Sequence, residues 1–191
     1  MNTSSKSHLT ENSRNLLLEI AWSSIRQGLD SGRPLTLNPI DYPLELQEKR
    51  ASFVTLNHQG TLRGCIGHLE AQAPLAIDVA ENAFSAAFQD PRFPPLDKLE
   101  IDNLTLHISV LTPSSSLLFE SEADLIEKIR PGIDGLILVE GRHRGTFLPS
   151  VWESLPDTQS FLHHLKQKAG LPGDYWSESI KVFRYETESF P

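Results

Sequence analysis

The residues of this chain that could carry chemistry centre on Leu62-Arg63-Gly64-Cys65-Ile66-Gly67, which holds the only cysteine of 191 residues. The thiol stands between two glycines and two positions after an arginine. Glycine removes side-chain bulk and permits positive φ, so the backbone can turn sharply or let another group approach closely. A guanidinium beside a thiol favours the thiolate. Cys65 is therefore a candidate nucleophile, and Arg63 is a candidate for activating it.

The same residues also allow a purely structural interpretation. Free cysteine is among the most frequently buried residue types, and a small side chain suits a tight hairpin. Arg63 either binds a carboxylate or phosphate of a ligand or forms a salt bridge inside the fold, for example with Asp90. Gly64 and Gly67 either admit a ligand to the backbone or make room for neighbouring parts of the chain. The sequence leaves both interpretations open.

A second candidate segment is Asp90-Pro91-Arg92-Phe93-Pro94-Pro95. Its prolines fix φ and prevent a helix from continuing, which predicts a rigid loop. Pre-organised loops often carry function, so Asp90 is a weaker candidate for the proton acceptor of Cys65 and Arg92 a candidate ligand-binding cation. In the structural alternative, Asp90 caps the loop, Arg92 ties it to the sheet and Phe93 fills the core.

The histidines and the remaining basic residues support no stronger hypothesis. His163 and His164 are adjacent on a predicted helix and point in different directions, so they cannot chelate one ion as an i, i+4 pair would. No metal and no cofactor are predicted. RNA binding would need the arginines of both halves to form one patch, and that set comprises Arg63, Arg92, Arg142 and Arg144. No glycine-rich phosphate loop, H-E-x-x-H or G-x-S-x-G motif is present.

The elements that must position Cys65 are two strands of a predicted β-hairpin, 51–57 and 61–69, joined by a turn at Asn57-His58-Gln59-Gly60. Side chains alternate between the faces of a strand. One face would hold Leu62 and Ile66 in the core, together with Gly64 and His68. The other face would hold Arg63, Cys65 and Gly67. A bulge at either glycine would shift this register.

The rest of the chain alternates helices with strands. Helices are predicted from Thr10 to about Asp30, from Pro74 to about Phe88, after Ser121, and from Asp157 to Ala169. Further strands are predicted at 104–110, 136–139, 146–148 and 180–185. This order indicates an α+β fold with a mainly antiparallel sheet and packed helices. We expect a disordered tail over 1–9 and one domain over 10–191, with a smaller lobe at about 97–150 as an alternative division.

Composition restricts the function classes. Acidic residues number 25 and basic residues 17, a formal charge of −8 that argues against broad nucleic-acid binding. A single cysteine excludes an internal disulfide framework and fits a reducing compartment. The polar start, 1–7, lacks the apolar region of a signal peptide, and no stretch approaches the ~18 apolar residues of a membrane span. A cytoplasmic protein is expected.

The segment Gly60-Thr61-Leu62-Arg63-Gly64-Cys65-Ile66-Gly67 resembles the signature of the AMMECR domain family, whose prokaryotic members are often labelled AmmeMemoRadiSam system protein A. The likeness continues in the family's order through Asn82-Ala83, Ala86-Ala87, Asp90-Pro91-Arg92-Phe93-Pro94-Pro95-Leu96, Ile108-Ser109-Val110-Leu111-Thr112, Asp134-Gly135-Leu136, Gly145-Thr146-Phe147-Leu148-Pro149-Ser150-Val151-Trp152 and Lys168-Ala169-Gly170-Leu171. Runs in register over about 10–191 are far more specific than one short motif. Two positions depart from the family's pattern: His107 stands where an acidic residue is expected, and Ser150 where glutamine is expected.

The resemblance implies a fold of two unequal lobes with a cleft between them. It also implies two partners, a Memo-like protein related to ring-opening dioxygenases and a radical SAM enzyme. It supplies no established activity. Three hypotheses follow: an accessory or interaction component beside these partners, which we favour; an enzyme that uses Cys65 with Arg63 on a small molecule or modified base; and RNA binding, which the charge opposes.

Overall fold

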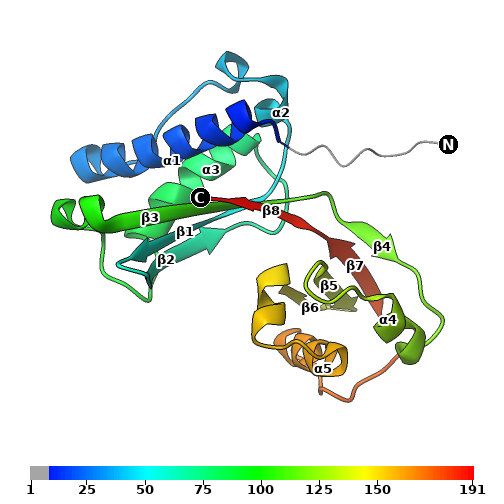
Figure 1. Ribbon diagram of the computed structural model, residues 1–191. Coiled ribbons are helices and arrows are strands. Elements are labelled where there is room, and N and C mark those ends of the chain that lie inside the picture. The colour runs from blue at the N-terminus through cyan, green and yellow to red at the C-terminus, as the bar shows by residue number, and fades with distance from the viewer. Residues whose placement is uncertain (1–8) are drawn as a thin grey trace. The chain divides into compact units, whose positions relative to one another are not determined.

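Residues 9–191 are described by a computed structural model, in which the chain forms two compact units (Figure 1). The first unit runs to Leu111 and includes Glu188–Pro191, and the second comprises Thr112–Thr187. Each contains a four-stranded sheet whose described strand pairs are antiparallel, so the predicted α+β fold is confirmed. The expected disordered tail lies outside the described residues except for Leu9, which is 3% exposed.

The smaller unit does not coincide with the lobe expected at about 97–150. The strand at 104–111 pairs with the hairpin of the first unit, and the strand at 181–185 pairs inside the second. The boundary therefore follows strand pairing, which no linker composition reveals.

The first unit places helices on one face of its sheet. Its elements are α1 (Glu11–Ser31), η1 (Pro39–Asp41), α2 (Leu44–Gln47), β1 (Ser52–His58), β2 (Thr61–Gly67), α3 (Leu75–Phe88), η2 (Lys98–Asn103), β3 (Leu104–Leu111) and β8 (Thr187–Phe190). The strand order is β2-β1-β3-β8, so β2 lies at one edge. In Figure 1, α3 packs on the sheet and α1 packs on α3.

Helix α1 begins and ends where the sequence predicts. The Thr10 hydroxyl accepts a hydrogen bond from the Ser13 N–H at 3.3 Å, which caps α1. The helix ends at Gly32 with φ 68°, a left-handed conformation that glycine adopts without strain. Leu17, Ile20 and Ile25 form its buried stripe. Capping thus fixes both ends of the helix that supports α3.

The hairpin contains a β-bulge at Arg63. Leu56 lies opposite Gly64 whereas Asn57 lies opposite Leu62, so Arg63 is the extra residue of β2. Strict alternation was therefore the wrong prediction for Leu62, whose exposed fraction is 39% and which does not anchor the core. Gly64 faces α3, because a Cβ on it would lie 2.0 Å from the Ala86 carbonyl oxygen. Close contact between β2 and α3 thus requires glycine here.

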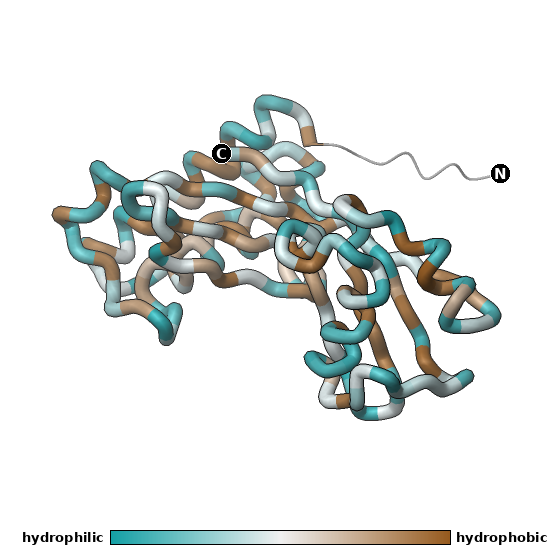
Figure 2. The backbone as a smooth tube through the Cα atoms, turned by 60° about the horizontal axis from the view of Figure 1, so that its bottom comes forward, coloured by the Kyte–Doolittle hydropathy of each residue, from teal (hydrophilic) through white to brown (hydrophobic). Residues whose placement is uncertain are grey.

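The second unit has a sheet of order β4-β7-β5-β6 and its own core. Its elements are β4 (Ser115–Leu117), α4 (Glu122–Lys128), β5 (Gly135–Glu140), β6 (His143–Phe147), η3 (Pro149–Glu153), α5 (Thr158–Lys168) and β7 (Lys181–Tyr185). Trp152 stacks on Phe161 with ring centroids 3.7 Å apart. In Figure 2 the strands carry many of the hydrophobic positions and the connecting loops are mainly hydrophilic.

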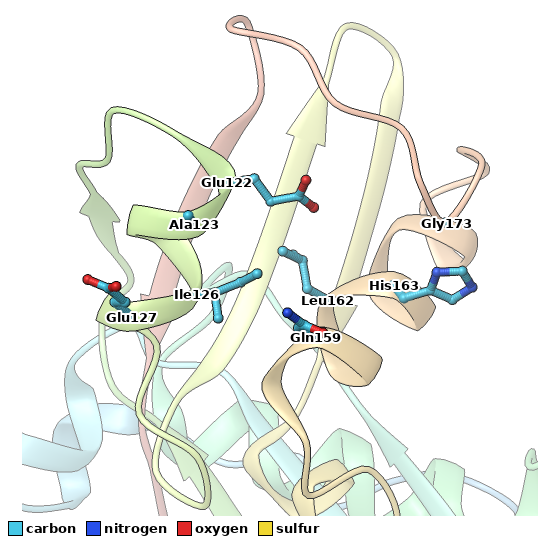
Figure 3. Close-up of a pocket in the computed structure, with 8 residues that line it drawn as sticks. All are labelled: Glu122, Ala123, Ile126, Glu127, Gln159, Leu162, His163 and Gly173. Carbon is cyan, nitrogen blue, oxygen red and sulfur yellow. The ribbon is translucent and has the colours of Figure 1, made fainter.

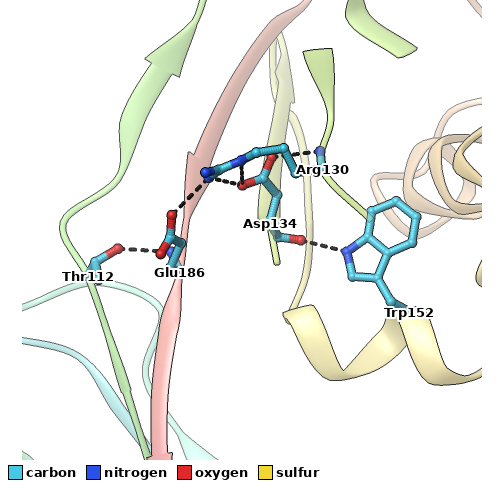
Figure 4. Close-up of polar contacts among 5 residues, drawn as sticks. All are labelled: Thr112, Arg130, Asp134, Trp152 and Glu186. Carbon is cyan, nitrogen blue, oxygen red and sulfur yellow. Dashed lines mark hydrogen bonds and ion pairs between the residues drawn. The ribbon is translucent and has the colours of Figure 1, made fainter. Parts of the chain in front are cut away.

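A buried carboxylate organises the entry to β5 (Figure 4). Asp134 is fully buried and accepts hydrogen bonds from the backbone N–H of Arg130 at 2.9 Å and from its Nε at 3.0 Å. Arg130 also binds Glu186 at 2.9 Å, and the Trp152 indole donates to the Asp134 carbonyl at 2.8 Å. The Asp134 carboxylate raises the pKa of Arg130, so the guanidinium stays charged. Glu186 and Thr112, at the two ends of the unit, are joined by two 2.8 Å hydrogen bonds.

We expect Gly64→Ala to destabilise the protein by about 3 kcal/mol, because the added methyl group overlaps backbone atoms of α3 that cannot move aside. Urea unfolding followed by far-UV circular dichroism measures the loss. Leu62→Ala, on the exposed side of the bulge, is the matched control, and its effect should stay below about 1 kcal/mol. Equal losses for the two variants would contradict the bulged register.

Candidate functional site

Cys65 lies on the sheet face that points away from the helices. Its β1 neighbour is Thr55, and Thr55 in turn lies opposite His107 on β3. The residues that alternate with them along β1 and β3, such as Val54 and Ile108, are fully buried against the helices. Cys65, Thr55 and His107 therefore form a row across three adjacent strands. We call Thr55, Cys65, His107 and Ser109 the open face.

The thiol is partly exposed and has one polar contact among the described residues. The Thr55 hydroxyl donates to Cys65 Sγ at 3.3 Å. His107 is exposed on the neighbouring strand, with no hydrogen bond to the described residues. The open face thus presents a thiol, two hydroxyls and an imidazole, with no carboxylate, ammonium or guanidinium group among them.

The backbone of Cys65 is bound by the proline-locked loop. The Cys65 N–H donates to Asp90 Oδ2 at 3.0 Å, and Arg92 Nη2 donates to the Cys65 carbonyl at 3.4 Å. Because β2 is an edge strand, these groups would otherwise face water or pair with another strand. Asp90 and Arg92 therefore take the place of a neighbouring strand at this one residue.

Asp90 is committed to this contact. Its exposed fraction is 3%, and its carboxylate also accepts hydrogen bonds from the Arg92 N–H at 3.1 Å, Nε at 2.9 Å and Nη2 at 2.7 Å. The bonds from Arg92 hold the pKa of Asp90 well below its usual range, and the same bonds raise the pKa of Arg92. Asp90 binds the backbone N–H of Cys65, whereas the hydrogen bond to the thiol comes from the Thr55 hydroxyl. This geometry matches the structural alternative for Asp90.

Arg63 is committed to a different acid from the one expected. Its Nε and Nη2 bind the two carboxylate oxygens of Glu100 at 2.7 and 3.0 Å, a bidentate pair, and Asp90 is not its partner. The guanidinium is mostly buried and lies 5.9 Å from the centroid of the Phe93 ring, which Arg92 approaches to 5.4 Å. Arg63 lowers the pKa of Glu100 to about 2. The charge of Arg63 is thus balanced inside the fold.

The candidate ligand-binding glycines make room for the chain itself. The Cβ position of Gly64 is occupied by the Ala86 carbonyl, and that of Gly67 by the Phe53 ring at 2.3 Å. Of the predicted site residues, the structure brings Cys65, Asp90 and Arg92 into direct contact. Arg63 joins them only through the shared Phe93 ring.

A buried polar cluster on the helix side of β1 was missed in the sequence. Asp78, 1% exposed, accepts hydrogen bonds from the Ser52 N–H at 2.8 Å, the Ser52 hydroxyl at 2.6 Å and Asn82 Nδ2 at 2.9 Å. His68 Nδ1 lies 2.7 Å from its other oxygen, on the side of β2 expected for His68. An Asp and an Asn four residues apart in the alanine-rich stripe of α3 were the available signal.

The described residues contain no group of three or more histidine, cysteine, aspartate or glutamate side chains arranged to hold a metal ion. Over residues 9–191, no helix is both long and apolar enough to cross a membrane. The four arginines considered for RNA binding are divided between the units, with Arg63 and Arg92 in the first and Arg142 and Arg144 in the second.

Comparison with known proteins agrees with this fold. The AMMECR1 family model matches residues 18–190. A protein of Methanothermobacter thermautotrophicus is 41% identical over 180 residues, which cover 91% of each chain. Protein MJ0810 of Methanocaldococcus jannaschii is 41% identical over 157 residues, 78% of this chain and 76% of that one.

A solved structure shares the architecture as well. The crystal structure of the uncharacterized protein PH0010 from Pyrococcus horikoshii is 37% identical with a TM-score of 0.82, over 95% of this chain and 92% of that chain. This chain therefore belongs to the AMMECR1 family, as the signature around Cys65 predicts.

The two ion pairs around Cys65 predict a characteristic acid sensitivity. Because the folded-state pKa values of Asp90 and Glu100 lie below their unfolded values, the stability that these carboxylates contribute is present above about pH 5 and is lost as pH falls towards 2. Glu100→Gln should cost about 2 kcal/mol at pH 7, and its deficit against the wild type should shrink towards pH 3.

Asp90→Asn should keep more of its deficit at pH 3, since the pKa of Asp90 lies further below its ordinary value. Urea unfolding at several pH values measures both series, with Glu178→Gln on an exposed loop as the control for loss of charge. A deficit for Glu100→Gln that does not change with pH would show that its carboxylate contributes no charge-dependent stability.

Proposed function

We propose that this protein is an accessory component that uses the open face to bind a partner in the cytoplasm. The partners are a Memo-like protein and a radical SAM enzyme, the two proteins that the likeness to the AMMECR family implies. The role is to present a substrate to a partner or to close a partner's active site.

The observation that supports this role most is the internal pairing of the charged signature residues. Arg63 is bound to Glu100, and Asp90 is bound to Arg92 and to the backbone of Cys65. An enzyme that used the thiol would need a proton acceptor within hydrogen-bond reach, or through one water. Among the described residues, the one hydrogen bond to Cys65 Sγ comes from the Thr55 hydroxyl, and the Arg92 guanidinium, which also interacts with the thiol, cannot accept a proton. The internal pairing of these residues fits a rigid binding surface, whereas a catalytic role for the thiol lacks its proton acceptor.

Co-purification of the three proteins tests the proposal. We expect the tagged protein to retain the Memo-like protein or the radical SAM enzyme at micromolar concentration. His107→Arg should reduce that retention at least tenfold, because it adds a long charged side chain to the centre of the open face. Glu81→Arg, on the exposed side of α3, is the matched control and should bind normally. No association of the wild type, or equal binding by the two variants, would overturn the proposal.

A cysteine-dependent enzyme is the second candidate, favoured by the partial exposure of Cys65 and the 3.3 Å contact from Thr55. A substituted serine keeps the size and the hydrogen bond but loses the thiol chemistry. If the protein is an accessory component, Cys65→Ser should retain partner binding and restore growth to a deletion strain as the wild type does. Normal binding with complete failure to restore growth would favour the enzyme instead.

A further inference from the structure

A second concave site lies in the second unit, formed by residues outside the signature. Its volume is about 550 Å³, within the range of small-molecule sites. Helix α4 supplies Glu122, Ala123, Ile126 and Glu127, helix α5 supplies Gln159, Leu162 and His163, and Gly173 follows α5. We call this site the α4–α5 pocket.

The floor of the α4–α5 pocket is apolar. Figure 3 shows Ile126 and Leu162 pointing towards one another from the two helices. Leu162 is almost fully buried, whereas Ile126 keeps part of its surface exposed. An apolar group of a ligand that covered this surface would remove it from water, which is favourable.

The charged groups that line the pocket are two carboxylates, Glu122 and Glu127, while Gln159 and His163 can both donate and accept hydrogen bonds. The Glu122 carboxylate projects into the space above the floor, and Gln159 projects from α5 on the other side (Figure 3). Glu122 uses Oε1 for the ammonium of Lys166, and its Oε2 has no partner among the described residues. Gln159 and Glu127 likewise make no hydrogen bond to the described residues.

Lys166, the partner of Glu122, cannot serve a ligand as a free cation. Lys166 is 1% exposed, its ammonium is paired with Glu122, and it lies 5.7 Å from the centroid of the Trp176 ring. This arrangement places one positive charge beneath Glu122 and leaves the lining with the charge of Glu127. An anionic ligand would be repelled by the carboxylates of Glu122 and Glu127, whereas an ammonium ligand would find carboxylate and amide oxygens to accept its hydrogen bonds.

We propose that the α4–α5 pocket binds a small organic cation, a protonated amine carried on an apolar group. The apolar group lies on Ile126 and Leu162, and the ammonium donates to Glu122 Oε2 and to the Gln159 side-chain oxygen. This site is independent of the open face and of the partners proposed for it, since all of its residues belong to the second unit.

An NMR titration of the full chain with phenethylamine tests the site. We expect backbone amide shifts confined to α4, α5 and the loop at Gly173, at millimolar ligand. Phenylethanol, with the same ring and no charge, should bind at least threefold more weakly, and phenylpropanoate should not bind. No shifts with the amine, or equal binding of the alcohol, would overturn the proposal.

Substitutions at Gln159 make the test specific, because this side chain is exposed and supports nothing in the fold. Gln159→Lys should weaken phenethylamine binding about fivefold and Gln159→Glu should strengthen it by a similar factor, since each changes the charge next to the ammonium. Gln167→Lys, an identical change on another part of α5, is the matched control and should bind as the wild type. An equal loss of phenethylamine binding in Gln159→Lys and Gln167→Lys would show that the loss comes from the net charge of the protein, and it would refute the site.

Discussion

The contact on which the signature region depends is the one between the Asp90 carboxylate and the backbone of Cys65. It places a buried negative charge against the outer edge of β2, and Arg92 balances that charge while binding the carbonyl of the same residue. A buried carboxylate is tolerated only when donors surround it, and the backbone N–H of an edge strand is one of the donors available. The rigid loop, the closed edge and the orientation of Cys65 all follow from this arrangement.

The surface that remains for binding is the open face, because the charged residues of the signature region are paired with one another. Arg63 and Glu100 neutralise one another, Asp90 and Arg92 do the same, and both guanidinium groups lie near the Phe93 ring. The open face therefore carries little fixed charge in a chain whose formal charge is −8. Recognition at such a face depends on shape and on hydrogen bonds from the thiol, hydroxyl and imidazole groups, more than on long-range attraction.

Local signals in the sequence gave correct predictions where one element decides the outcome. Thr10, Ser121 and Asp157 cap their helices, and the alternation at 104–110 marks a true strand. The predictions that differ from the structure concern features that depend on contacts between two separate elements. The bulge at Arg63 turns Leu62 away from the core, the partner of Arg63 proved to be Glu100, and the boundary of the second unit follows strand pairing. No pattern within one segment records such pairings, although the family signature did predict the fold.

The second unit is inserted in the first: Thr112–Thr187 lies in the chain between β3 and β8. During synthesis, β3 emerges before the whole of the second unit and β8 after it. One side of β3 therefore stays unpaired until about 75 further residues have been translated. Translation of that stretch takes several seconds at typical rates. An unpaired strand edge is the kind of surface that other nascent chains can join. Slow folding of the inserted unit, whose two ends Thr112 and Glu186 are hydrogen-bonded to each other, would lengthen that interval, so its folding rate bears on the yield of the whole protein.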